Sequence, residues 1–269
     1  MIAFVGLSLA GVWDAARDRR VDGWVPAPAP EARAAYGALV RDLARAAPTG
    51  RVPRDADTRA RALGLELRVR DGAALLVEAA GGAAGAGLVA VRLGPLPCEL
   101  VLAAPHPVTD LHTGAIAGAL FDAGDVRAVY LATTWRDAGP DMDPAHAPAS
   151  WLSTASDALA DALDDPLFVQ VHGFAEDRTE ADVVVSDGAA PLPPWHLAAA
   201  VDAITRGLGV GDVRTGDEVP ALAARTNAQG KLLAGRARFL HVELSPAVRT
   251  SLLADPAPLG GVLLDLAER

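Results

Sequence analysis

The chain changes its rhythm of apolar and polar positions near residue 100. Before that point, the strand-length apolar runs LELRV, ALLVEA, GLVAVRL and ELVLAA are separated by Asp71-Gly72, by the glycine-rich GGAAGAG and by Gly94-Pro95. Turn residues between short apolar runs predict consecutive hairpin strands from residue 65 to 102. Upstream of them, apolar residues at helical spacing predict an amphipathic helix over residues 31–47.

After residue 100, strand and helix patterns alternate. The runs DVRAVYLATT, LFVQVHGF, ADVVVSDG and RFLHVELS are of strand type, and SWLSTASDALADAL, HLAAAVDAITRGLG and SPAVRTSLLAD have helical periodicity. This alternation predicts an α/β fold with a mixed, mostly parallel sheet flanked by helices. We therefore divide the chain into a β-rich N-terminal portion, residues 1–97, which could belong to the same sheet, and an α/β core, residues 98–269.

The chain starts with the apolar stretch MIAFVGLSLAGVW. The stretch lacks the basic region that opens a signal peptide, and the charged segment 14–20 interrupts it before it reaches membrane-spanning length. We expect a folded strand and turn here, and a cytoplasmic protein. The alternative is that the stretch is a signal and that the protein is exported.

Charge and cysteine content narrow the classes of partner and site. A formal net charge of −10 argues against nucleic acid or an anionic membrane surface as the main partner, because both repel an acidic protein. The single cysteine, Cys98, excludes an internal disulfide and a cysteine-rich zinc site. The sequence leaves the oligomeric state open.

Two predicted strands lead into histidines. ELVLAA is followed by a loop with His106 and Asp110, and LFVQVHGF contains His172 near its end. Ligands of open α/β sheets bind beyond the carboxyl ends of the strands. Two imidazoles and a carboxylate leave one metal position for water, so His106, Asp110 and His172 are the candidate metal ligands. His112 competes with Asp110 for that place and could instead support a ligand or contact substrate.

Glu243 is the candidate general base. It lies among the apolar residues of RFLHVELS, and burial facing the site would raise its pKa and suit it to take a proton from water. His241 shares its strand face by the two-residue period of a strand and could support the site. The alternative is that Glu243 forms an ion pair with Arg249 or Arg225 and has only a structural role, connecting the strand to a helix.

Further polar residues are candidates for binding substrate. Arg225 and Asn227 in the predicted polar loop AARTNAQG could bind a carboxylate or polarise a carbonyl, as could Arg249 if it points inward. In DMDPAHAPASW, His146 is a candidate substrate contact, whereas Asp143 or Ser150 is interpreted as a helix cap.

The order of a strand-end His, a nearby acid, a second strand-end His and a late F-x-x-x-E-L strand resembles the zinc carboxypeptidase-like superfamily, which includes N-formylglutamate amidohydrolases and phage poly-γ-glutamate hydrolases. The resemblance covers residues 98–250 and implies a phosphorylase/hydrolase-like fold. It also implies Zn²⁺ bound by His106, Asp110 and His172, with Glu243 activating the water. The carboxypeptidase pattern is His-x-x-Glu, so the longer gap from His106 to Asp110 is closer to the poly-γ-glutamate hydrolase type.

We therefore expect a zinc-dependent hydrolase that cleaves the C–N amide bond of an N-acyl amino acid or peptide-like substrate bearing a carboxylate, with metal-bound water as nucleophile. His and carboxylate ligands suit Zn²⁺ and would also accept Mn²⁺, Fe²⁺ or Co²⁺. The alternatives are a metal-dependent esterase or phosphoesterase, and a non-catalytic ligand-binding protein with a degenerate site.

Overall fold

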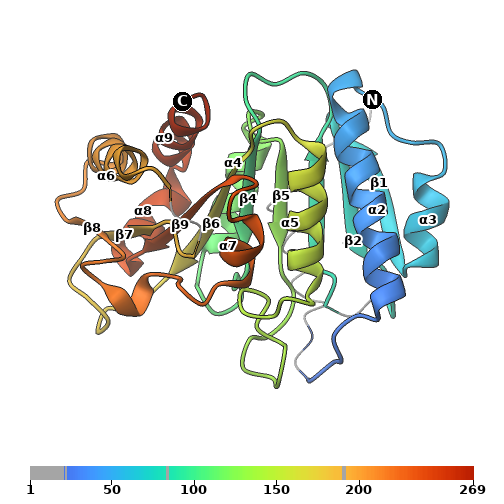
Figure 1. Ribbon diagram of the computed structural model, residues 1–269, viewed down its shortest axis with the longest axis horizontal. Coiled ribbons are helices and arrows are strands. Elements are labelled where there is room, and N and C mark those ends of the chain that lie inside the picture. The colour runs from blue at the N-terminus through green and yellow to red at the C-terminus, as the bar shows by residue number, and fades with distance from the viewer. Residues whose placement is uncertain (1–20, 22, 83–84, 190–191) are drawn as a thin grey trace, which may run out of the picture.

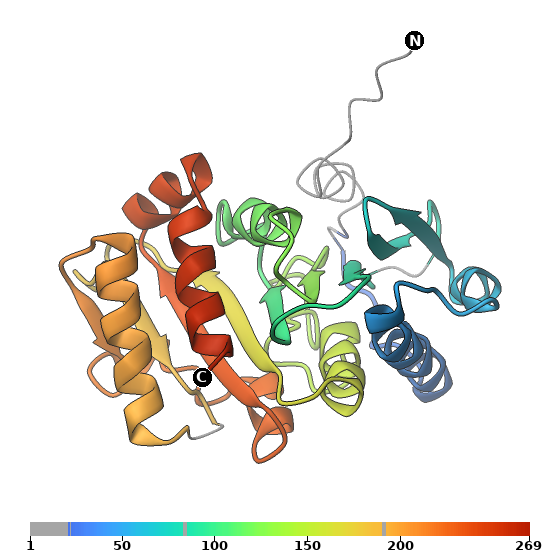
Figure 2. The same ribbon diagram turned by 90° about the horizontal axis from the view of Figure 1, so that it is seen from above.

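The computed structural model describes residues 21, 23–82, 85–189 and 192–269, which form one nine-stranded sheet with helices on both faces (Figures 1 and 2). Its strands are β1 (Leu65–Arg70), β2 (Ala73–Glu78), β3 (Leu88–Arg92), β4 (Leu100–Ala104), β5 (Ala128–Leu131), β6 (Leu167–Gly173), β7 (Val183–Ser186), β8 (Val213–Thr215) and β9 (Arg238–Leu244). The helices are α2 (Pro30–Ala46), α3 (Ala56–Ala62), α4 (Thr113–Asp122), α5 (Trp151–Ala162), α6 (Pro194–Leu208), α7 (Ala228–Leu233), α8 (Pro246–Ala254) and α9 (Ala257–Ala267), with 3₁₀ turns η1 (Ala47–Thr49) and η2 (Pro220–Leu222).

The strand order is β1-β2-β3-β5-β4-β6-β9-β7-β8, and the predicted α/β fold with a mixed sheet is confirmed. The strands at the centre, β5, β4, β6 and β9, are parallel neighbours. Antiparallel pairing begins on either side, where β3 joins β5 and β7 joins β9. The carboxyl ends of β4, β6 and β9 therefore meet at one edge of the sheet, which is where ligands bind in such sheets.

The hairpin rhythm before residue 100 is confirmed in part. Strands β1, β2 and β3 form an antiparallel meander, and β3 pairs with β5, so these strands extend the sheet that carries the α/β elements. The prediction that ELVLAA continues the hairpins is wrong, because β4 lies between the parallel strands β5 and β6. Helix α2 confirms the predicted amphipathic helix. Helix α3, strand β8 and helix α9 were not predicted.

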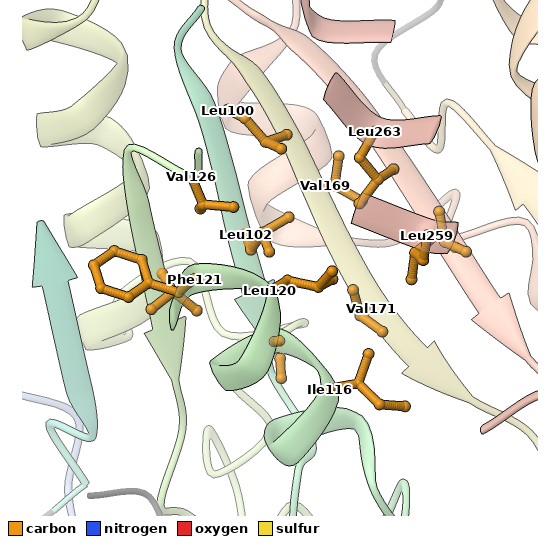
Figure 3. Packing of buried hydrophobic residues seen from close by; sticks show 14 of the residues in the cluster. Leu100, Leu102, Ile116, Leu120, Phe121, Val126, Val169, Val171, Leu259 and Leu263 are labelled. Atoms are coloured by element: carbon orange, nitrogen blue, oxygen red, sulfur yellow. The ribbon is translucent and has the colours of Figure 1, made fainter. Parts of the chain in front are cut away.

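Each face of the sheet has its own apolar core. Side chains of α4, α6, α8 and α9 pack on one face, and those of α2, α3, α5 and α7 pack on the other. Figure 3 shows the first of these cores, where Leu120 of α4 and Leu263 of α9 lie over Leu102 of β4 and Val169 of β6. With both faces covered, β4 is apolar throughout, as expected for a buried parallel strand, whereas β6 and β9 carry polar residues among their apolar ones: Gln170 and His172 in β6, and Arg238, His241 and Glu243 in β9.

Arg127 is a charged side chain at the base of this sheet. It is 1% exposed, and its guanidinium donates to both carboxylate oxygens of Glu99, at 2.6 and 3.2 Å. It also donates to the carbonyl oxygens of Arg92 and Gly94, at 2.7 and 2.9 Å. Because these partners flank β3, β4 and β5, one buried cation joins the amino-terminal strands to the centre of the sheet.

The apolar start of the chain, for which a folded strand or a signal was considered, lies outside the described residues. Within the described part, no helix has both the length and the apolar character needed to cross a membrane.

Candidate metal centre

The chemistry-bearing residues of β6 and β9 face the same side of the sheet. In the register of this parallel pair, Gln170 lies beside His241, and His172 lies beside Glu243. These residues follow Phe168 and Phe239, which belong to the core under α5 and α7, at intervals of two along each strand. One sheet face therefore changes from apolar to polar where the strands end.

The structure brings together the three residues that the sequence proposed as metal ligands. His172 Nδ1 lies 3.2 Å from Asp110 Oδ2, and His106 Nδ1 lies 3.5 Å from the same oxygen. All three side chains are buried, and their donor atoms converge as a possible metal-binding group. A tetrahedral zinc ion with bonds of about 2.0–2.2 Å holds neighbouring donor atoms roughly 3.3–3.6 Å apart. The observed separations fit such an ion.

The loop after β4 sets the positions of His106 and Asp110. His106 stands between two prolines, and its carbonyl accepts a hydrogen bond of 2.7 Å from the amide of Asp110. Asp110 Oδ2 also accepts from the amide of Gly173, at 3.3 Å, which ties this loop to the end of β6. The loop is thus rigid before any ligand binds, which lowers the entropy lost on binding.

A second carboxylate orients His106. Asp143 Oδ1 lies 2.8 Å from His106 Nε2, so that nitrogen carries a proton and Nδ1 faces the site. A carboxylate behind a metal-binding histidine is a common arrangement that fixes the ring and raises its basicity. The sequence pattern suggested Asp143 or Ser150 as a helix cap. Ser150 is the residue that caps α5, by accepting from the amide of Ser153.

Replacing Asp143 with Ala is expected to weaken zinc binding about 10- to 100-fold, because the His106 ring loses the partner that orients it. Competition with a fluorescent zinc chelator measures the dissociation constant. Asp137→Ala is the matched control, since it removes an exposed carboxylate from the same connection between β5 and α5. Equal affinities for the two variants would contradict a role for Asp143.

Protonation states at the site follow from burial and close pairing. Burial lowers the pKa of His172, whereas for His106 the hydrogen bonds to Asp110 and Asp143 outweigh burial and raise the pKa. Hydrogen bonds to the two histidines overcome burial and hold the pKa of Asp110 well below its usual range. A neutral imidazole and an ionised carboxylate are the forms that bind a metal, so the shifts of His172 and Asp110 favour metal binding, whereas the raised pKa of His106 means that this ring must release its proton when a metal binds.

Glu243 lies in the same pocket with its pKa displaced upward. Burial, followed by the charge of Asp110, raises the pKa of Glu243 to about 8. The neighbouring ring of His241 has its Nε2 3.7 Å from Glu243 Oε1, and burial lowers the pKa of His241 well below its ordinary value. The two side chains therefore form a neutral pair at neutral pH when no metal is bound.

The raised pKa of Glu243 has a consequence for stability. Between its unfolded value of 4.5 and its folded value of about 8, the folded protein binds the extra proton, so stability falls as pH rises through this range. In chelator-treated protein, Glu243→Gln should therefore unfold at a higher temperature than the wild type, by a margin that grows from pH 6 to pH 9. Thermal unfolding followed by circular dichroism measures this, and a margin independent of pH would contradict the shift.

A pocket of about 460 Å³ opens beside the three candidate metal ligands, between the loops that follow β5, β6 and η2.

 It is lined by the three metal-ligand candidates, Glu243 and His241, and by three arginines that come from different loops: Arg136, Arg178 and Arg225. Sequence reasoning singled out only Arg225 of the three. Arg136 follows the end of β5, just as His106 follows the end of β4. This position after a strand could have marked Arg136 as a candidate from the sequence.

The arginines differ in their partners. Arg136 reaches the ligand group, with its Nη1 3.2 Å from His106 Nδ1 and 3.7 Å from Asp110 Oδ1. Arg225 is exposed and pairs with Asp217 at 2.5 Å. Arg178 is exposed at the pocket rim. Arg136 therefore lies nearest to the place where a reacting group would sit.

The other substrate candidates divide between the pocket and its surroundings. His146 and Asn227 line the pocket, and His146 is held by Asp143 at 3.0 Å. The segment predicted as a polar loop is only partly a loop, because Asn227 caps helix α7 by accepting from the amide of Gly230. A polar run beside a strand does not reveal such a short helix, since the cap and the loop use the same residue types.

His112 and Arg249 lie outside the residues that line the pocket. His112 adopts a left-handed backbone conformation, with φ of 76°, where the chain turns into α4. The guanidinium of Arg249 donates to the carbonyl oxygens of Leu111 and Phe174, both at 2.9 Å. Arg249 thus joins the loops that follow β4 and β6.

No protein-family model matches the chain, and no curated protein matches it. Among solved structures, it is similar to N-formylglutamate amidohydrolase from Ralstonia eutropha JMP134, with a TM-score of 0.47, 15% identity, and coverage of 67% of this chain and 96% of that chain. It is also similar to N-acetylmuramoyl-L-alanine amidase from Clostridium difficile 630 (TM-score 0.38, 13% identity, 63% and 95% covered) and to a bacteriophage poly-γ-glutamate hydrolase (TM-score 0.36, 11% identity, 62% and 82% covered). N-formylglutamate amidohydrolases and phage poly-γ-glutamate hydrolases both belong to the superfamily that the sequence resembles. TM-scores below 0.5 assign no activity to this chain.

Proposed function

We propose that the protein is a zinc-dependent hydrolase that cleaves an amide bond in an N-acyl amino acid or a peptide-like substrate. The observation that carries the proposal is the convergence of His106, Asp110 and His172 at separations that fit a tetrahedral ion, with Glu243 in the same pocket. Two imidazoles and one carboxylate with an open fourth position are typical of catalytic zinc sites. When bound, zinc lowers the pKa of water and polarises a carbonyl oxygen.

The chain supplies the proton transfer. Glu243 is buried beside the ligand group and, in its ionised form, accepts a proton from the attacking water. The same carboxyl group then donates that proton to the amide nitrogen as the C–N bond breaks, and the nitrogen is released as an amine. A bound dication near Glu243 favours the ionised carboxylate and so brings its pKa down from about 8 toward neutrality. This is the range in which a general base works best at physiological pH.

The arginines of the pocket support a substrate that bears a carboxylate. Arg136, Arg178 and Arg225 line the pocket around the ligand group, and a guanidinium can bind a carboxylate through two parallel hydrogen bonds. Arg136 lies close enough to the ligand group to stabilise negative charge on a carbonyl oxygen during the reaction. Asn227 and His146 add polar contacts to the same pocket wall.

Metal content, measured by elemental mass spectrometry on purified protein, tests the proposal. We expect about one zinc per chain in the wild type and little in His172→Ala, because one of three protein ligands is lost. His112→Ala is the matched control and should retain its zinc, since this histidine lies outside the pocket. A screen of N-acyl amino acids for amine release follows. Wild-type protein that takes up no zinc, even after incubation with it, would overturn the proposal.

A further inference from the structure

One buried arginine connects the backbone on two sides of the site. Arg249 lies on α8, the helix that follows β9, and is 7% exposed. Its Nη1 donates to the carbonyl oxygen of Leu111 and its Nη2 donates to that of Phe174, both at 2.9 Å. Leu111 directly follows Asp110 in the sequence, and Phe174 is two residues after His172. The guanidinium therefore joins the backbone beside one candidate ligand to the backbone beside another.

The guanidinium also packs against Gly173, at the end of β6. A Cβ atom on this glycine would lie 2.7 Å from each of Cζ, Nε and Nη1 of Arg249. Three equal distances place that position above the plane of the guanidinium, so the flat face of the group lies against the glycine. The amide of Gly173 donates to Asp110 Oδ2 at 3.3 Å. Gly173 thus contacts both the candidate ligand and the arginine.

Arg249 has a cost for stability. Its Nε is buried and has no hydrogen-bond partner in the part of the chain that the structure describes. A buried donor that is left without a partner destabilises a fold. The two acceptors of the guanidinium are neutral carbonyl groups, so these bonds hold backbone in place and neutralise no charge. Packing alone therefore does not account for a guanidinium at this position.

We propose that Arg249 is a positioning residue, which holds Asp110 and His172 at the separation that a zinc ion requires by joining the backbone beside each of them. Asp110 Oδ2 lies 3.2 Å from His172 Nδ1. Ligands must be held within about 0.5 Å of their productive positions, and these two come from different connections of the sheet. Without the guanidinium their separation would vary, and zinc would bind less tightly. The inference rests on the proposed function, in which both residues bind zinc.

Zinc affinity distinguishes positioning from charge, because the two predict opposite changes. Arg249→Met removes a positive charge near a cation site, so electrostatics alone would strengthen zinc binding. Loss of positioning weakens it instead, and we expect a dissociation constant about 10- to 100-fold higher than in the wild type. Competition with a fluorescent zinc chelator measures the constant. Binding by Arg249→Met that is no weaker than that of the wild type would overturn the inference.

Arg238→Met is the matched control for a loss of stability alone. Arg238 also donates to backbone carbonyls, those of Leu266 and Ala267, at 3.0 and 2.9 Å. It lies at the start of β9, at the end of the strand away from Glu243. We expect this variant to be less stable but to bind zinc within about threefold of the wild type, because its contacts are distant from the site. Equal weakening in the two variants would assign the effect of Arg249 to stability and overturn the inference.

Gly173→Ala displaces the guanidinium but leaves its charge in the protein. The new Cβ requires only the end of a flexible side chain to move, so the fold should persist while the bonds to Leu111 and Phe174 are lost. We expect weaker zinc binding, and little further weakening when Gly173→Ala is added to Arg249→Met, since both changes remove the same contact. Fully additive losses would show that the two residues act independently and would overturn the inference.

Hydrogen exchange followed by mass spectrometry tests the connection without zinc. In chelator-treated protein, Arg249→Met should exchange about tenfold faster than the wild type in segments 105–112 and 173–178, whereas Arg238→Met should not. Unchanged exchange of both segments in Arg249→Met would overturn the inference. A wild type that binds no zinc would defeat the proposed function instead, and the exchange rates would still decide whether Arg249 holds these two segments.

Discussion

Replacing Glu243 with Gln is expected to lower kcat for amide hydrolysis about 10²- to 10⁴-fold, the usual contribution of a positioned general base. The amide has nearly the same size and shape as the carboxyl group but accepts no proton from water. Glu243 lies outside the group of His106, Asp110 and His172 but belongs to a second possible metal-binding group with His172 and His241. We expect zinc content to stay at the wild-type level, and a loss of zinc would instead assign Glu243 as a ligand. Steady-state kinetics and elemental analysis on the same preparation measure both quantities.

The pH profile gives a second check on Glu243. The base acts only when ionised, so kcat/KM of the wild type should fall as pH drops through its pKa, which lies below the metal-free value of about 8. The variant should lack this acidic limb. Activity within about tenfold of the wild type, with the limb retained, would assign the base to another group.

Loss of the Arg127 guanidinium should cost about 3 to 5 kcal/mol of unfolding free energy, because breaking a buried ion pair leaves its partners without compensation. Arg127→Met retains much of the volume but leaves the Glu99 carboxylate and the carbonyls of Arg92 and Gly94 without their donor. Denaturation in urea measures the change. Zinc content should persist, since Arg127 precedes β5 at the edge of the sheet opposite to the site.

Arg236→Met is the control for Arg127. Arg236 also forms two ion pairs, with Asp157 and Asp161, but its side chain is 37% exposed. Exposed pairs contribute little, so we expect a change of less than about 1 kcal/mol. Similar losses for the two variants would show that burial of Arg127 does not set the strength of its contacts.

The strand ends of the site could be predicted because their signal is local. Apolar runs that lead into His106 and His172, and Glu243 within an apolar strand, mark positions where a buried strand turns polar. Parallel strands carry such positions to the same edge, so the three could be expected to meet even though the sequence does not state which strands are neighbours. The register of β6 and β9 supplies that last step.

Other parts of the site depend on long-range packing. Asp143 and Arg136 come from the connection between β5 and α5. The local sequence does not predict the path of this connection over the sheet. The place of β4 was misjudged because a buried strand has the same apolar pattern in a hairpin as between parallel neighbours. Gln170 had a visible signal, a polar residue inside an apolar strand, but its partners on α7 became evident only in the fold.

The ligands proposed for zinc come from well-separated parts of the chain, the loop after β4 and the end of β6, while the base comes from β9. An unfolded chain does not hold these side chains together, so zinc bound as proposed would have high affinity only for the assembled sheet. On this proposal folding would precede zinc binding, and the bound ion would then shift the folding equilibrium by mass action. The metal would bind after folding and connect the loop after β4 to the end of β6. The supply of zinc would then help to determine the lifetime of the folded state.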